Sequence, residues 1–91
     1  SGEPTGPVNP IQGKVLAVRP EVNLVMLSVG SDEGVKKGFR FTVYRDEQYI
    51  GKIEVEKVFS DMCSARILTD WTKGIIKEND DASTRVYQPS A

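Results

Sequence analysis

The chain has 91 residues, a length that suits one small domain. Its residues are 38% hydrophobic and 27% charged, a composition too apolar for intrinsic disorder. Twelve basic and thirteen acidic residues leave a formal net charge of −1, so no overall field draws the chain to nucleic acid or to an anionic membrane. The sequence contains no histidine, which removes the Ser/His/Asp and Cys/His catalytic pairs and the His-ligated zinc sites. We therefore expect a protein that is not an enzyme and that uses no cofactor or metal.

Residues 1–10 are rich in proline, a composition that indicates an extended linker. Ser1-Gly2 is typical of an expression remnant. We expect one domain over residues 11–87 and a short tail over residues 88–91. A linker at this end favours the C-terminal domain of a longer protein, whose other part would hold any membrane anchor. No apolar run approaches the ~18 residues that a membrane-spanning helix needs, so no span is expected in this chain.

β-branched residues dominate the composition, with eleven Val, six Ile and five Thr against four Leu. This usage is typical of strands, and turn signals recur about every eight to twelve residues, as in small barrels and sandwiches. No stretch has the apolar spacing of a packed helix. Because closure removes edges that would otherwise aggregate, we predict an all-β fold, a small closed or partly open six-stranded antiparallel β-barrel, SH3-like or related.

Alternation of apolar and polar residues predicts six strands. In chain order they cover residues 12–19, 24–29, 39–45, 49–59, 63–68 and 82–87. Residues 20–23 and 46–48 have the composition of tight turns. Past Lys57 the adjacent apolar residues Val58 and Phe59 change the phase of the fourth strand, which predicts a bulge or a strong bend.

Glycines mark the loop between the second and third predicted strands. The glycines expected at structural turns are Gly30, Gly34, Gly38 and Gly51. Gly34 and Gly38 are expected to take positive φ in a compact or 3₁₀ turn that covers Val35. A phosphate-binding loop would need four residues between its glycines and then Lys-Ser or Lys-Thr, and this spacing fails. Lys36 and Lys37 are therefore expected to project as solvated charges.

Several other residue groups could carry chemistry. Acidic pairs occur at 32–33, 46–47 and 80–81, all in predicted turns, and none has the alternating pattern of a calcium loop. Spacing alone leaves a glycosidase carboxylate pair open, although a closed barrel of this size has little room for the cleft. The single cysteine, Cys63, is expected to be a small buried residue. After a loop over residues 69–74, Ile75-Ile76 is expected to be an apolar anchor, with Val86 and Ala82 facing inward.

Exposed aromatic residues are the best candidates for a binding surface, because Tyr87 and two other tyrosines fall at polar-facing positions of predicted strands. The candidate partner-binding residues are Tyr44, Tyr49, Trp71, Lys36 and Lys37. They suit docking with another protein or with further copies of this chain. The alternative is single-stranded nucleic-acid binding by stacking, although the basic residues form no stripe. A third possibility is strand addition at an open barrel edge. The simplest structural role for each aromatic residue taken singly is to cover part of the barrel wall.

Four segments, residues 13–18 (GKVLAV), 25–31 (VMLSVGS), 34–45 (GVKKGFRFTVYR) and 50–55 (IGKIEV), carry a resemblance to known bacterial domains. The chain is similar to the C-terminal domain of flagellar assembly protein T and, more loosely, to the β-domains of the rod shape-determining protein MreC. The resemblance implies an SH3-like or related barrel, a non-catalytic role and an envelope or periplasmic setting. Trp71 and its loop depart from both families, so neither indicates the partner.

Overall fold

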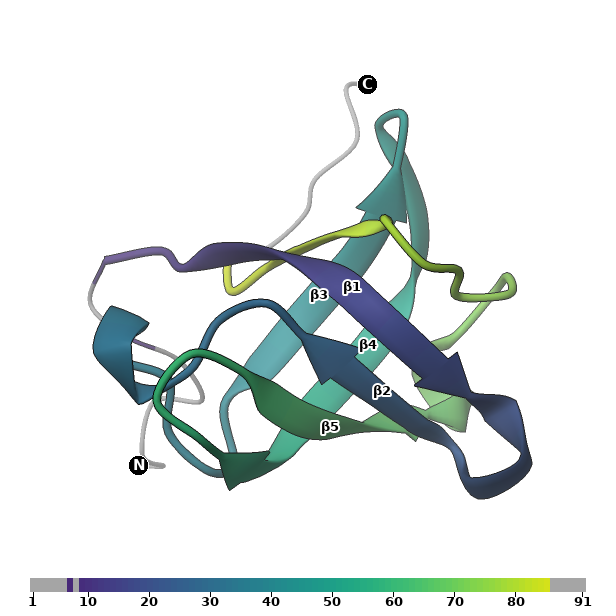
Figure 1. Ribbon diagram of the computed structural model, residues 1–91. Helices are drawn as coiled ribbons and strands as arrows, with labels where there is room; N and C mark the ends of the chain where they lie inside the picture. The colour runs from purple at the N-terminus through teal and green to yellow at the C-terminus, as the bar shows by residue number, and fades with distance from the viewer. Residues whose placement is uncertain (1–6, 8, 86–91) are drawn as a thin grey trace, which may run out of the picture.

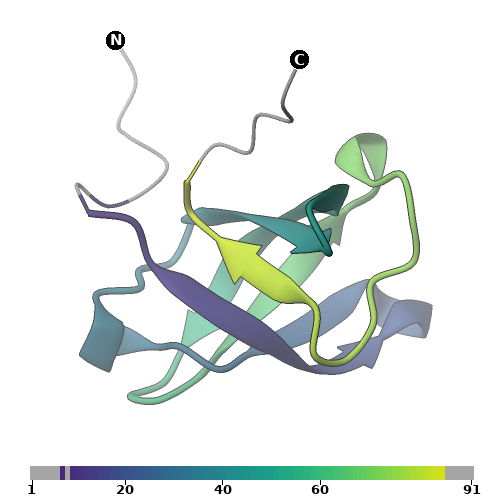
Figure 2. The ribbon, with the colours of Figure 1, turned by 90° about the horizontal axis from the view of Figure 1, so that it is seen from above.

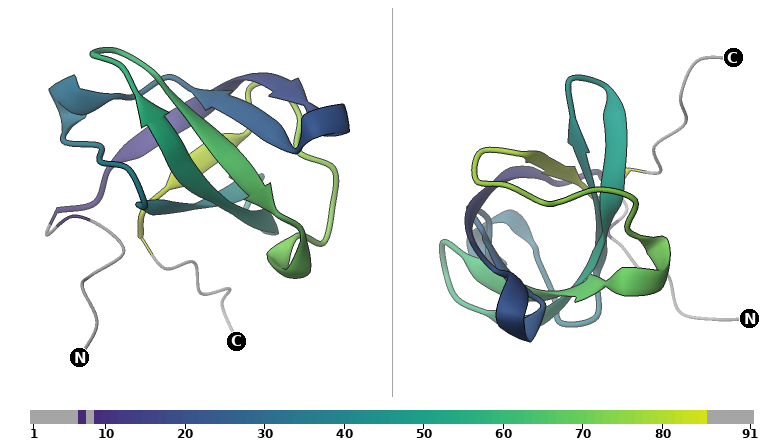
Figure 3. Two further views of the ribbon diagram at one scale, coloured as in Figure 1. Left: turned by 90° about the horizontal axis from the view of Figure 1, so that it is seen from below. Right: turned by 90° about the vertical axis from the view of Figure 1, so that its right-hand side faces the viewer.

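The structure is a computed structural model that describes residue 7 and residues 9–85 (Figure 1). Six antiparallel strands form a closed barrel with the order β1–β2–β5–β4–β3–β6, and β6 returns to pair with β1. The strands are β1 (Gln12–Arg19), β2 (Leu24–Leu27), β3 (Arg40–Arg45), β4 (Gln48–Val58), β5 (Cys63–Leu68) and β6 (Asp81–Ser83). The predicted six-stranded antiparallel barrel is confirmed, and Figure 3 shows its closed ring along the barrel axis.

Strand bounds agree with the predicted ones at β1 and β5 and differ elsewhere. β2 ends at Leu27 rather than at residue 29, because its pairing with β5 stops where Leu27 lies opposite Cys63. β6 is three residues long and lies between β1 and β3 (Figure 2). The predictions for the linker, for the tail and for Val86 and Tyr87 concern residues 1–6, 8 and 86–91, which lie outside the described residues.

Three 3₁₀ turns connect the strands: η1 (Pro20–Val22), η2 (Ser31–Glu33) and η3 (Thr69–Trp71). The predicted glycine-hinged turn is present, because Gly34 and Gly38 have φ of 90° and 92°. Val35 beneath it is only 3% exposed. Gly30 is needed for a different reason, since a Cβ there would lie 2.1 Å from the Phe59 carbonyl oxygen.

Alternate residues of the strands point into the barrel and form a single core. Its members are Ile11, Val15, Val25, Leu27, Val29, Val35, Phe41, Val43, Ile50, Ile53, Val55, Cys63, Ala65, Ile76 and Ala82. Phe41 is the largest fully buried side chain. The inward-facing residues of every strand meet in this core, so the outward-facing residues are left to form the surface.

The strand register shifts at three places, one of them between Val43 and Tyr44 of β3, where Ile50 of β4 is left without a partner on β3. In β4, Val55 pairs with Ala65 and Lys57 pairs with Ser64, so Glu56 is the extra residue. The bulge therefore lies just before Lys57, whereas the sequence pattern predicted it just after that residue. Because an extra residue reverses the alternation, Val58 turns back to pack against the core. In β1 the register shifts in the same way, between residues 15 and 17.

Two predictions about single residues are wrong. Gly51 does not lie in a turn but in the middle of β4, where it is buried opposite Val43 of β3. Ile75 does not anchor the loop after β5, because it is 76% exposed and only Ile76 is buried in the core. The strand predicted over residues 49–59 already contained Gly51, and that position is the one the structure has. The orientation of Ile75 depends on the path of the loop after β5, which alternation within strands does not predict.

Candidate functional site

Trp71 ends the 3₁₀ turn η3, which follows β5 directly and lies against the outside of β4 (Figure 3). The Thr72 hydroxyl donates to the Leu68 carbonyl at 2.8 Å and so closes this turn. Gly51 on β4 leaves room for that threonine, because a Cβ at Gly51 would lie 2.6 Å from Thr72 Oγ1. Because Gly51 has no side chain, the turn that bears Trp71 can approach β4 closely.

Backbone hydrogen bonds attach the rest of this loop to the barrel. The N–H groups of Lys73 and Gly74 donate to the Ile50 carbonyl at 2.8 and 3.1 Å, along the edge of β4 that β5 leaves uncovered. Farther along, the Asn79 N–H donates to the Val15 carbonyl at 2.8 Å. The loop that bears Trp71 is therefore held by β4 on one side and by β1 on the other.

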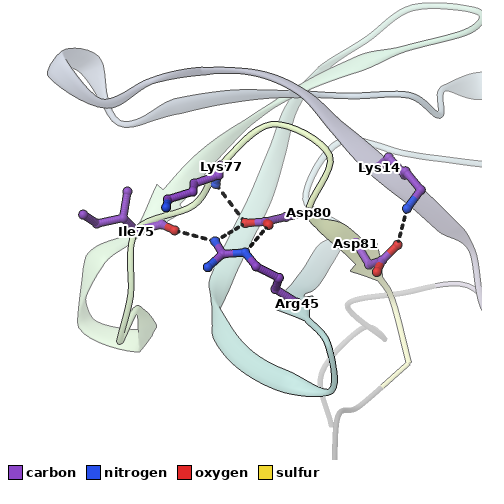
Figure 4. Close-up of polar contacts among 6 residues, drawn as sticks. All are labelled: Lys14, Arg45, Ile75, Lys77, Asp80 and Asp81. Atoms are coloured by element: carbon purple, nitrogen blue, oxygen red, sulfur yellow. Dashed lines mark hydrogen bonds and ion pairs between the residues drawn. The ribbon is translucent and has the colours of Figure 1, made fainter.

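An ion pair secures the far end of the same loop (Figure 4). Arg45 at the end of β3 donates to both carboxylate oxygens of Asp80, at 2.7 and 2.9 Å, and to the Ile75 carbonyl. Asp80 is 3% exposed and also accepts the Lys77 N–H. Burial alone raises the pKa of the Asp80 carboxyl, but the hydrogen bonds from Arg45 and Lys77, with their charges, outweigh burial and lower that pKa.

A groove of about 220 Å³ lies beside Trp71 on the outer wall of the barrel, and we call it the Trp71 groove. Its polar lining residues are Asn23, Arg40, Arg66, Thr69 and Asp70, and its apolar lining residues are Ile67, Leu68 and Trp71. The Trp71 side chain is 54% exposed. The Lys52 ammonium group, which projects from β4, lies 5.2 Å from the centre of the Trp71 ring.

Charged side chains line up beside the groove because of the strand register. Glu54 of β4 pairs with Arg40 of β3 on one side and with Arg66 of β5 on the other. Arg40 Nε donates to Glu54 at 3.0 Å, whereas Arg66 approaches Glu54 at 3.8 Å and Glu56 at 3.5 Å. The result is a row of alternating charges in which one carboxylate lies between two guanidinium groups.

The predicted binding residues are only partly brought together. Tyr49 donates a hydrogen bond from its hydroxyl to the Trp71 carbonyl, and burial raises the pKa of this phenol, which keeps it protonated. Tyr44 pairs with Tyr49 across β3 and β4, and its hydroxyl accepts a hydrogen bond from Gln12 of β1. The two predicted lysines are exposed on the loop before β3 and do not line the groove.

Sequence patterns missed most of the groove. The outward direction of Arg40, Lys52 and Arg66 follows from alternation within each strand, so each was visible as a surface residue. Their proximity depends on the register of three strands and on the bulge at Glu56. Trp71 was found as a polar-loop aromatic, but its cationic neighbour lies 19 residues earlier in the chain and gave no local signal.

The remaining chemistry-bearing residues are accounted for structurally. Cys63 is fully buried, and burial raises the pKa of its thiol to about 11. Within residues 7 and 9–85, no group of three or more Cys, Asp or Glu side chains is placed to hold a metal ion. The described part of the chain also has no helix that is long and apolar enough to cross a membrane.

Comparison of the chain with protein-family models and with curated proteins finds no match.

Proposed function

We propose that this barrel is a non-catalytic interaction module that docks another protein on the Trp71 groove. The observation that carries the proposal is an exposed tryptophan beside a groove, on a loop that two strands hold in place. Tryptophan, tyrosine and arginine supply most of the binding energy at protein interfaces, and Trp71, Arg40 and Arg66 meet here. A fixed loop lowers the entropy lost on binding.

The size and charge of the groove support docking over catalysis. Small-molecule sites commonly enclose about 300–1,000 Å³, whereas this groove measures about 220 Å³. The carboxylate beside it, Glu54, already contacts the guanidinium groups of Arg40 and Arg66, so its oxygens are engaged by protein partners. These features suit contact with a side chain better than chemistry on a substrate.

Single-stranded nucleic acid is the second candidate, favoured by one observation: a stacking residue, Trp71, with Lys52, Arg40 and Arg66 on the same wall. Against it, three acidic residues share that wall, and Asp70 lines the groove itself. A phosphate backbone needs a continuous positive track. We therefore place docking of a protein first.

The envelope or periplasmic setting of the module rests on the resemblance alone. The SH3-like assignment, the position at the C-terminus of a longer bacterial protein and the envelope or periplasmic location stay predictions. Partners in that setting would be another protein or further copies of this chain. Strand addition is the weakest of the three binding modes, because the described strands close into a ring without an open edge.

Selection of peptides from a randomised display library, with the purified barrel as target, tests the proposal. The matched variants are Trp71→Ala and Phe59→Ala, since both aromatics are about half exposed and lie beyond opposite ends of β5. We expect the selected peptides to bind the wild-type and Phe59→Ala proteins with equal affinity. We expect them not to bind the Trp71→Ala protein. A selection that yields no binders, or binders that ignore Trp71→Ala, would refute the proposed function.

A further inference from the structure

We infer that the occupant of the Trp71 groove is a peptide that presents a carboxylate side chain next to an apolar side chain. The inference rests on the proposed function and deepens it, because it names what the partner must carry. It starts from the size of the groove. About 220 Å³ is room for one or two side chains rather than for an enclosed small molecule.

The apolar part of the partner has a matching wall. Trp71, Ile67 and Leu68 form the apolar part of a lining that is otherwise mostly polar, and the Trp71 side chain is 54% exposed. Lys52 lies over the same ring and holds it by a cation–π contact. An aliphatic or aromatic side chain that packs here removes apolar area from water without moving the loop.

The carboxylate is indicated by two guanidinium groups with spare donors. Arg40 contacts Glu54 through Nε, so its terminal nitrogens have no hydrogen-bond partner among the described residues. Arg66 approaches Glu54 and Glu56 only at 3.8 and 3.5 Å, whereas a charge-assisted hydrogen bond is about 2.7–2.9 Å long. Both arginines line the groove, and a planar fork of N–H donors matches a carboxylate in two-point geometry.

Charge complementarity separates a peptide from a polyanion. The three cations of this wall, Arg40, Lys52 and Arg66, are balanced by Asp70 and the two glutamates of β4. A balanced wall has no net field to hold a chain of phosphates. One carboxylate needs only the unused donors of one or two arginines, which this wall supplies.

Two synthetic peptide pools test the inference. The first contains hexapeptides of mixed sequence with acetylated and amidated ends, and the second is the same pool with every Asp and Glu replaced by Asn and Gln. Each pool is passed over immobilised wild-type barrel and over the Arg66→Gln, Arg40→Gln and Trp71→Ala variants. Lys36→Gln and Lys37→Gln are the controls, since they remove the same charge from residues outside the groove. We expect retention of acidic peptides with an apolar neighbour, and a loss of about tenfold or more in affinity for Arg66→Gln.

Different failures point to different conclusions. The pool without Asp and Glu could be retained as well as the acidic pool, with that retention abolished by Trp71→Ala. This result would overturn the carboxylate inference and leave the docking function standing. No retention of either pool would overturn both. Salt-sensitive binding of a short oligothymidylate that displaces the peptides would favour nucleic acid instead. A wild-type dimer in sedimentation that Trp71→Ala dissociates would make a second copy of the chain the occupant, and the inference would be wrong.

Discussion

The ammonium group of Lys52 lies 5.2 Å from the centre of the Trp71 ring, across the boundary between β4 and the turn η3. The ring is still 54% exposed, so this contact orients the tryptophan without burying it. An exposed cation–π pair stabilises a fold by only about 0.5–1 kcal/mol. Trp71 is therefore held in place while most of its binding surface stays in contact with water.

Trp71→Ala is accordingly expected to lower the free energy of unfolding by no more than about 1 kcal/mol. Urea denaturation followed by circular dichroism measures this directly, because the fluorescence of the only tryptophan is lost in the variant. A loss of several kcal/mol would mean that the residue is a structural cover for the barrel wall. The docking proposal would then lose its main support.

Gly30→Ala is expected to be the most damaging single glycine change in the loop before β3. The added Cβ would lie 2.1 Å from the Phe59 carbonyl oxygen and 2.7 Å from the Met62 backbone nitrogen, atoms that cannot rotate away. We expect a loss of about 3 kcal/mol or more, the upper range for overpacking. Gly34→Ala meets no close atom but must keep a φ of 90°, so it should lose only about 1 kcal/mol.

Chemical denaturation of the two variants in parallel checks this order. Equal losses would show that the conformational freedom of glycine, rather than the approach of the β4–β5 connection, dominates at both positions.

Gly51 and Thr72 are expected to be coupled. Gly51→Ala places a methyl group 2.6 Å from Thr72 Oγ1 and should cost about 2 kcal/mol. Thr72→Ala removes that hydroxyl together with its hydrogen bond to the Leu68 carbonyl, at a cost of about 1 kcal/mol. Because the second change relieves the first, the double variant should be more stable than the sum by about 1 kcal/mol. Additive losses in this double-mutant cycle would contradict the close approach.

The Asp80 ion pair predicts how stability depends on pH. The pKa of Asp80 is lower in the folded protein than its ordinary value of 3.8. The stability it contributes is therefore complete above that ordinary value and is lost as the pH falls through the lower folded pKa. At neutral pH, Asp80→Asn should cost about 2 kcal/mol, since it leaves the Arg45 donors without a charged partner.

Asp81→Asn is the matched control, because Asp81 bonds Lys14 at the surface and should contribute little. The difference between the wild-type protein and Asp80→Asn should shrink below pH about 4. A difference that stays constant through acid would show that the carboxylate charge is not the source of the stabilisation.

The fold was predictable where local patterns decide it. Alternation set the bounds of β1, and the spacing of Gly34 and Gly38 predicted a turn that buries Val35. Gly51 fell inside a predicted strand and was nevertheless assigned to a turn, because what requires a glycine there is a neighbouring segment of chain that the local pattern does not reveal. Its partner, Thr72, lies in a loop that crosses back over β4.

The candidate site was predictable only in part, for the same reason. Trp71 stood out as a large apolar residue in a polar loop. The two arginines beside it are brought together because both lie opposite Glu54 in the strand register, one on each side. That pairing depends on where the bulge at Glu56 falls, which differed from the predicted place by about one residue. A shift of one residue moves outward side chains to the opposite face, so the groove could not be assembled from single strands.

Amide chemical-shift mapping of a selected peptide on the wild-type barrel tests the central claim most directly. If the Trp71 groove is the docking site, the largest shifts will fall on η3, on Lys52 and on Arg66, and the Trp71 indole N–H will move with them. If the largest shifts fall instead on the loop around Lys36 and Lys37, or spread evenly over the barrel, the Trp71 groove is not the site at which this protein docks its partner.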